Sequence, residues 1–241
     1  MSRMAASQAW KRAISILTIS TAFTAGFAAS TRIVLLLSLP PGFLDDWVAR
    51  HPSLGILDVD DVRYLHHAGM TLAHVIPALV FAILAPLQFV ASIRSRRPGW
   101  HRWAGRTLVT LGTIVGISGL GLGLTTALEY GGASEAAPIA VFAPLFLFSL
   151  YKGVTHIRRG QVASHREWMI RAFSIAASAG TVRLTSFFFA VSPAVRHAPS
   201  RFIGVVFWTG FVISLCVAEL WIQYTRTRES GVCARTAAAS L

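Results

Sequence analysis

The chain has few charged residues, fewer acidic than basic ones, and very little cysteine. Charged side chains make up 13% of its 241 residues and hydrophobic ones 54%, which excludes an ordinary soluble globular domain. Its two cysteines, Cys216 and Cys233, provide neither a disulfide framework nor a metal-binding pattern. Lys and Arg outnumber Asp and Glu by 22 to 10. Because the basic residues flank apolar stretches and form no polar domain, we attribute the excess to membrane topology and exclude nucleic acid as a partner.

Motifs of several enzyme classes are absent as well. The sequence has no HExxH, no GxSxG, no P-loop and no carboxylate pair within an apolar stretch, so metalloprotease, hydrolase and phosphoryl-transfer functions lack support. Glycines at positions 116, 119, 121 and 123 lie within an apolar stretch, where we expect them to form a small-residue face for close helix packing. The sequence leaves open whether the chain is an enzyme.

What the chain does contain is a series of apolar stretches long enough to cross the roughly 30 Å hydrocarbon core of a bilayer. They predict an all-α integral membrane protein, a single membrane domain over residues 1–241 built as a bundle of about six transmembrane helices. The expected spans are 13–39, 64–93, 104–128, 138–154, 169–191 and 202–224, followed by a flexible cytoplasmic tail at 225–241. The first stretch exceeds the apolar core of a signal peptide, so we expect a span there.

Basic and acidic residues alternate from one connection to the next. The N-terminus, the second and fourth loops and the C-terminal tail are basic, whereas the first and third loops are acidic. Cytoplasmic loops of membrane proteins carry the excess of Lys and Arg, so we expect both termini in the cytoplasm. Arg196 and Arg201 in the fifth loop disagree with this orientation, but the other connections outweigh them.

Two of the basic connections have similar sequences. Residues 96–106 and 158–171 each contain a double arginine, a short turn and then His-Arg with a tryptophan nearby. This similarity indicates a weak parallel repeat, which would place His101 and His165 at the same depth on two helices running the same way. Interfacial anchoring explains either histidine alone. As a matched pair they are equally consistent with metal ligands, because nearby arginines disfavour the charged imidazolium.

Other ionisable residues lie inside the expected spans. His74 lies about 12 Å into the second span by helical rise, and Arg183 lies at a similar depth in the fifth. Groups that deep face the bundle interior or a wet cavity. We therefore expect either a ligand, quinone or propionate site, or a buried polar pair that fixes helix packing. Glu219, near the inner end of the sixth span, is expected to form a structural ion pair with Arg106 or Arg171.

These motifs resemble those of a bacterial membrane protein family, domain of unknown function 2306. The resemblance rests on residues 85–89, 101–106, 165–171, 181–184 and 218–219, and it covers about residues 64–224. The chain departs from the family pattern by lacking an asparagine shortly before Ala218. The resemblance implies a multi-pass protein of the bacterial cytoplasmic membrane and the importance of these residues. It implies no reaction.

The leading hypothesis is a membrane redox protein that binds haem b and transfers electrons. His101 and His165 are the expected axial ligands, and Arg102, Arg166 and Arg171 are expected to neutralise the haem propionates. The full set of expected cofactor-binding residues is His74, His101, Arg102, His165, Arg166, Arg171 and Arg183.

Two alternatives stay open. The first is a transporter of small molecules or ions whose polar interior contains His74, Gln88, Arg183 and Glu219, although its spans lack the paired Gly/Pro interruptions typical of transporters. The second is a lipid-interacting or assembly protein whose cytoplasmic arginines bind anionic headgroups. The expected partners are membrane lipids and either haem or a quinone. The sequence does not define the oligomeric state.

Overall fold

The computed structural model describes residues 67–190 and 199–238, together with isolated positions between 30 and 66. Across the two continuous ranges the chain consists of helices joined by short turns, which confirms the predicted all-α class. The long helices are α4 (Ala68–Gln88), α6 (Pro98–Thr126), α7 (Gly132–Arg158), α8 (Val162–Ala190) and α10 (Pro199–Ala238). A short helix, α5 (Ala91–Arg96), joins α4 to α6, and a π-helical turn, η1 (Ala127–Gly131), joins α6 to α7.

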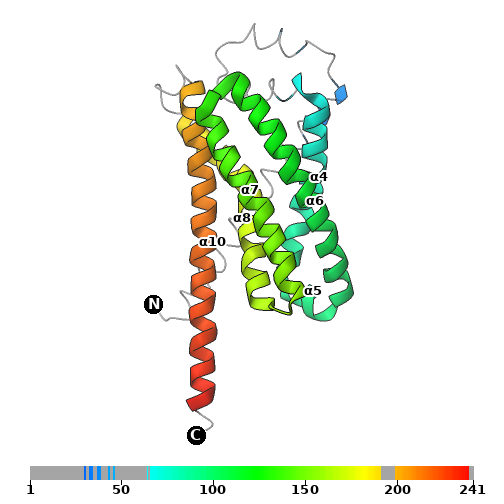
Figure 1. The fold of residues 1–241 in the computed structure, drawn as a ribbon, viewed down its shortest axis with the longest axis vertical. Helices are drawn as coiled ribbons and strands as arrows, with labels where there is room; N and C mark the ends of the chain where they lie inside the picture. The colour runs from blue at the N-terminus through cyan, green and yellow to red at the C-terminus, as the bar shows by residue number, and fades with distance from the viewer. Residues whose placement is uncertain are drawn as a thin grey trace.

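Four helical segments among the described residues are long and apolar enough to cross a membrane. They are Ala68–Gln88, Pro98–Arg158, Val162–Phe189 and Phe202–Thr227, and their most apolar 18-residue stretches have mean hydropathies of 2.1, 1.8, 1.2 and 2.0. The second has 61 residues and reverses direction between α6 and α7 (Figure 1). Helices α4, α6, α7, α8 and α10 overlap five of the expected spans. The expected span at 13–39 lies largely outside the described residues.

The first four of these helices form two hairpins of the same construction. Helix α4 packs along α6, and α7 packs along α8. Ala68 and Gly132, which begin α4 and α7, are 64 residues apart, as are Pro98 and Val162, which begin α6 and α8. Helices α6 and α8 run the same way, and α10 packs on α7 and α8 and extends beyond the bundle (Figure 1). The predicted parallel repeat is confirmed.

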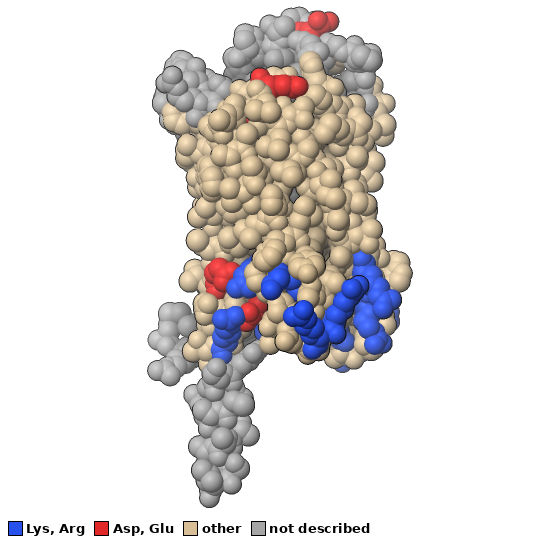
Figure 2. All heavy atoms as spheres, viewed as in Figure 1, with Lys and Arg blue, Asp and Glu red and all other residues tan. Residues whose placement is uncertain are grey.

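Charge is concentrated at one end of the bundle. On the face shown in Figure 2, Lys and Arg side chains gather where α5 lies, next to a broad band without charged residues. We call this the basic end; it contains α5, the start of α6 and the turn at Arg159–Gln161 between α7 and α8. An uncharged band beside a basic end is the distribution expected of helices that cross a bilayer.

Two glycines make the reversals between helices possible. Gly132 has φ +64° where η1 meets α7, and Gly160 has φ +72° in the turn between α7 and α8. Residues with a Cβ rarely adopt this left-handed conformation, whereas glycine adopts it without steric cost. Helix α4 ends differently: Phe89 and Val90 donate to the carbonyls of Pro86 and Leu87, at 3.1 and 3.2 Å, which tightens the last turn.

The core lies between the two hairpins. Its buried side chains come from four helices: Phe81, Ala85, Leu108, Phe142, Phe146, Leu150, Ala172 and Ile175. The small-residue face predicted for α6 is confirmed. A Cβ on Gly116 would collide with Leu147, and one on Gly123 would lie 2.9 Å from Ile139. Glycine at these positions allows α7 to approach α6 closely.

Candidate functional site

His101 and His165 occupy equivalent places at the basic end. Each lies three residues after the start of its helix, Pro98 in α6 and Val162 in α8. The backbone N–H of His101 donates to the Arg97 carbonyl at 3.1 Å, and that of His165 to the Gln161 carbonyl at 2.9 Å. Both rings are half-buried and lie within electrostatic range of one another. The two histidines therefore take equivalent positions in the two hairpins, and their equal depth in a membrane stays a prediction.

The ring of His165 is held in one orientation. Its Nδ1 donates a hydrogen bond to the backbone carbonyl of Gly153, at 2.8 Å. Since a carbonyl oxygen only accepts, Nδ1 carries the proton and Nε2 of the neutral ring presents a lone pair. The lack of a side chain at Gly153 allows α8 to approach α7 closely, because a Cβ there would lie 2.5 Å from Met169 Sδ. This close approach brings the His165 ring to the Gly153 carbonyl. A histidine whose Nδ1–H is bound by a carbonyl and whose Nε2 is turned outward is typical of metal ligands.

Two buried polar atoms in the first hairpin lack a hydrogen-bond partner among the described residues. They are Nδ1 of His101 and Nε2 of Gln88. Gln88 is the last residue of α4, and its Oε1 lies 3.7 Å from the position that a Cβ on Gly105 would take, one turn along α6 from His101. Because buried polar atoms are nearly always hydrogen-bonded, these two indicate a place where a bound group meets the chain. Gln88 is a site residue that sequence reasoning had assigned only to the transporter alternative.

The predicted arginines are placed in different surroundings. Arg166 adjoins His165 and is half-buried, whereas Arg102 is exposed. Arg94 on α5 lies within electrostatic range of His101, although no sequence motif had distinguished it from the other arginines of its connection. Arg94 therefore acts on His101 from a neighbouring helix, and Arg166 adjoins His165 along the chain.

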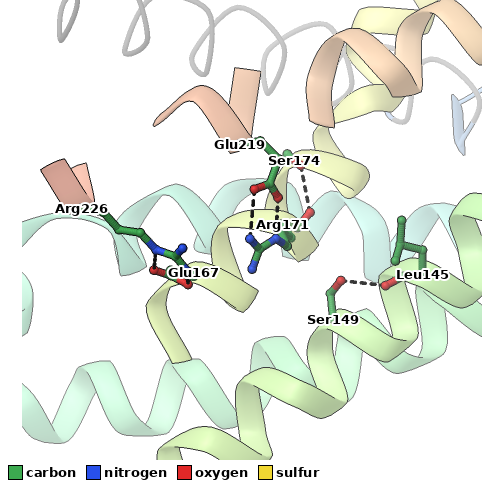
Figure 3. A network of polar contacts seen from close by, with 7 residues as sticks. All are labelled: Leu145, Ser149, Glu167, Arg171, Ser174, Glu219 and Arg226. Atoms are coloured by element: carbon green, nitrogen blue, oxygen red, sulfur yellow. Dashed lines mark hydrogen bonds and ion pairs between the residues drawn. The ribbon is translucent and has the colours of Figure 1, made fainter. Parts of the chain in front are cut away.

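Arg171 is engaged by Glu219, as the sequence had predicted for one of two arginines. Its Nε lies 2.5 Å from Glu219 Oε1 and its Nη2 lies 3.0 Å from Oε2 (Figure 3). The guanidinium also lies 4.7 Å from the centre of the Trp168 ring, within cation–π range. The two-pronged geometry fixes α8 against α10 and compensates the charge of Arg171.

A second pair, which the sequence had not predicted, joins the same two helices nearer the basic end. Arg226 donates to both carboxylate oxygens of Glu167 (Figure 3). Glu167 precedes Arg171 by one helical turn and Arg226 follows Glu219 by two turns, so the two pairs follow the antiparallel contact of α8 with α10. The pairing depends on how the helices are aligned, which sequence spacing alone does not provide.

The Arg171–Glu219 pair is expected to stabilise the fold measurably. Arg171→Met leaves the Glu219 carboxylate without its two charged hydrogen bonds and is expected to lower the free energy of unfolding by about 2 kcal/mol. The measurement is thermal unfolding in detergent of Arg171→Met, Glu219→Gln and the double variant, compared with Arg226→Met. We expect a coupling energy between the two sites and a smaller loss at the more exposed Arg226. Purely additive single losses would contradict the prediction.

The hydrogen bonds described for His74 and for Arg183 are to different partners. His74 Nδ1 lies 3.1 Å from the hydroxyl of Ser118 on α6, and Gly119 provides room for the ring, since a Cβ there would lie 2.9 Å from His74 Cε1. Arg183 Nη1 donates to the carbonyl of Ala179 in its own helix, at 2.9 Å. A joint site or a polar pair of His74 with Arg183 stays a prediction.

The end opposite the basic end has a contact of its own. His67 Nε2 lies 3.0 Å from Glu129 Oε2, which joins the start of α4 to η1. Within the part of the chain that the structure describes, no cluster of three or more His, Cys, Asp or Glu side chains is able to hold a metal ion. A site with two histidine ligands at the basic end does not require such a cluster.

Comparison with known proteins bears on this arrangement. Neither the curated proteins nor the solved structures include a match to the chain. A family described as predicted membrane protein, DUF2306, matches residues 71–222. The match extends from α4 to α10 and includes both histidines of the basic end and the Arg171–Glu219 pair. The chain therefore belongs to the DUF2306 family and is a multi-pass membrane protein.

Proposed function

We propose that the chain is a membrane redox protein that binds haem b between His101 and His165. The observation that carries the proposal is the hydrogen bond from His165 Nδ1 to the Gly153 carbonyl, which leaves Nε2 as the ligating atom. His101 takes the equivalent position in the other hairpin and has a buried ring nitrogen with no described partner. Histidine pairs are suited to b-type haem because the neutral imidazole is a strong axial ligand.

The other residues of the basic end fit such a group. Arg94, which acts electrostatically on His101, and Arg166, which adjoins His165 along the chain, would pair with carboxylates such as propionates. Arg171, which the sequence had also suggested for this role, is engaged by Glu219 and instead holds α8 in position. Bound haem would supply one-electron transfer. The chain's part is to orient the His165 ring through Gly153 and to exclude water with the core above the site.

We also propose a finer topology: six transmembrane helices, both termini in the cytoplasm, and insertion in a bacterial cytoplasmic membrane. The gathering of Lys and Arg at the basic end (Figure 2) supports a cytoplasmic location for that end. The apolar stretch at 13–39 would be the span that completes an even number.

The absorption spectrum of the purified protein tests the haem proposal. We expect full-length chain, produced in cells supplied with a haem precursor and purified in mild detergent, to show a Soret band. After reduction it is expected to show the sharp bands of a six-coordinate haem, at about one haem per chain given one pair of axial ligands. A colourless protein that also fails to bind added haemin would end the proposal.

A transporter with a polar interior is the second candidate. The observation in its favour is the buried Nε2 of Gln88, which has no hydrogen-bond partner among the described residues and is suited to contacting a polar substrate. A transporter would move a solute across the membrane of reconstituted vesicles and would contain no pigment. The redox proposal expects bound haem instead.

A further inference from the structure

One side of α6 carries two arginines that no carboxylate of the described residues pairs with. Arg102 and Arg106 are both exposed and lie one turn apart on the same side of the helix. Neither guanidinium takes part in a hydrogen bond or ion pair with a described residue, in contrast to Arg171 and Arg226, which each bind a glutamate. These two positive charges are therefore available to a ligand outside the bundle.

The same side of α6 continues as an exposed stripe into the apolar band. Beyond Arg106, Ile114 is 42% exposed and Ile117 61% exposed, and Trp103 beside the arginines is 63% exposed. At 100° per residue all these positions fall within a sector of about 120°. The opposite side of α6 packs on α4 and α7. In a membrane protein this sector faces lipid, so we call the five residues the α6 stripe.

The position of Arg106 limits what its partner can be. It lies eight residues after Pro98, which is about 12 Å along the helix, and its side chain is long enough to reach back toward the basic end. An unpaired guanidinium on a lipid-facing surface is costly unless it meets an anion. Phospholipid phosphates are anions that a side chain reaching back toward the headgroups would meet, and arginine binds phosphate through two parallel hydrogen bonds.

The rest of the stripe favours a lipid over an acidic protein. Trp103 is the residue type that anchors helices at the headgroup level. Ile114 and Ile117 offer apolar surface two turns further along α6, beyond the exposed Thr110 and Thr113. An acidic protein partner would meet the end of the bundle and would leave that apolar surface uncovered. Charge and apolar surface follow one another along the helix as headgroup and acyl chain do in a phospholipid.

We propose that the α6 stripe binds an anionic phospholipid, with its phosphate held by Arg102 and Arg106 and an acyl chain lying along Ile114 and Ile117. The site is independent of the proposed haem site, because its side chains face outward from α6. Arg102 accordingly acts on the lipid and not on a propionate.

Lipid retention by the full-length protein tests this proposal. The purified chain is exchanged into neutral detergent with phosphatidylglycerol or phosphatidylcholine of identical acyl chains, and bound lipid is counted by native mass spectrometry. We expect the protein to prefer phosphatidylglycerol about tenfold, since each arginine near a phosphate contributes appreciably. The double variant Arg102→Gln/Arg106→Gln is expected to lose the preference, and Arg102→Lys/Arg106→Lys to keep most of it.

The matched control is Arg158→Gln/Arg159→Gln, which removes two exposed arginines at the same end of the bundle but outside the α6 stripe. It is expected to retain the preference for phosphatidylglycerol. Inorganic phosphate is expected not to displace the lipid, because it lacks the contact with the isoleucines. Equal binding of the two lipids, an equal loss in the control, or displacement by inorganic phosphate or by an acidic peptide at the concentration of the lipid would each overturn the proposal.

Discussion

Purified chain carrying His165→Leu is expected to lose most of its haem. Leucine has nearly the volume of histidine, so the helix is preserved, but it has no lone pair to replace Nε2 and no donor for the Gly153 carbonyl. His101→Leu removes the opposite ligand and is expected to have the same outcome. The measurement is the ratio of Soret to protein absorbance, with and without added haemin, on protein that elutes as a single species. Haem content is expected to fall sharply because each variant removes one of the two proposed ligands.

His156→Leu is the matched control. His156 also lies at the basic end, where its Nδ1 lies 2.5 Å from Gln161 Oε1 in the turn before α8. This variant is expected to retain the full Soret absorbance. Retention of haem by both His101→Leu and His165→Leu would place the ligands elsewhere in the chain. Loss of haem in all three variants would show that disruption of the basic end, and not removal of a ligand, causes the loss.

The histidine pair was predictable from the sequence for a definite reason. Each histidine follows a turn that the sequence marks, at Pro98 in one hairpin and around Gly160 in the other. Each then lies three residues after the first residue of its helix, Pro98 in α6 and Val162 in α8. The Arg171–Glu219 pair was similarly accessible, because a charge inside an apolar stretch requires a partner at its own level.

Other features of the site were not predictable, because they depend on contacts between helices. The Gly153 carbonyl is a backbone group, and no side-chain pattern indicates that it receives His165 Nδ1. The buried Nε2 of Gln88 and the nearness of Arg94 to His101 likewise follow from how α4, α5 and α6 pack. Sequence patterns identify which groups are present at the basic end, whereas their orientation is determined by packing.

The helix boundaries were also only partly predictable from the sequence. Hydropathy suggested a loop between the spans at 104–128 and 138–154, around the acidic residues Glu129 and Glu135. In the structure this segment is helical, with η1 leading directly into α7 and Glu135 fully buried in the first turn of α7. Apolar stretches mark the part of a helix that lies in lipid. They do not mark where its backbone hydrogen bonds stop, and glycines such as Gly132 do that here.

Gly204→Val is expected to cause the largest loss of stability of any single substitution considered for this chain. A Cβ at Gly204 of α10 would collide with the backbone carbonyl of Ser134 near the start of α7 and would lie 2.9 Å from the Ser134 Cβ. Because the colliding atoms belong to backbone, no rotamer change relieves the contact, and α10 must move away from α7. Overpacking of this kind costs about 3 kcal/mol. Thermal unfolding in detergent, followed by circular dichroism, measures the loss.

Gly69→Val separates the collision from the general effect of valine in a helix. Gly69 lies in the first turn of α4, where a Cβ would meet nothing within 4 Å, so this variant is expected to unfold at nearly the temperature of the unmodified chain. Displacement of α10 would also move Glu219 relative to Arg171. Gly204→Val should therefore abolish most of the coupling energy between those two residues, while Gly69→Val should preserve it. If the two glycine variants were equally stable, α10 would be able to shift at Ser134 without a loss of stability. The close approach of α10 to α7 would then not hold Arg171 and Glu219 together.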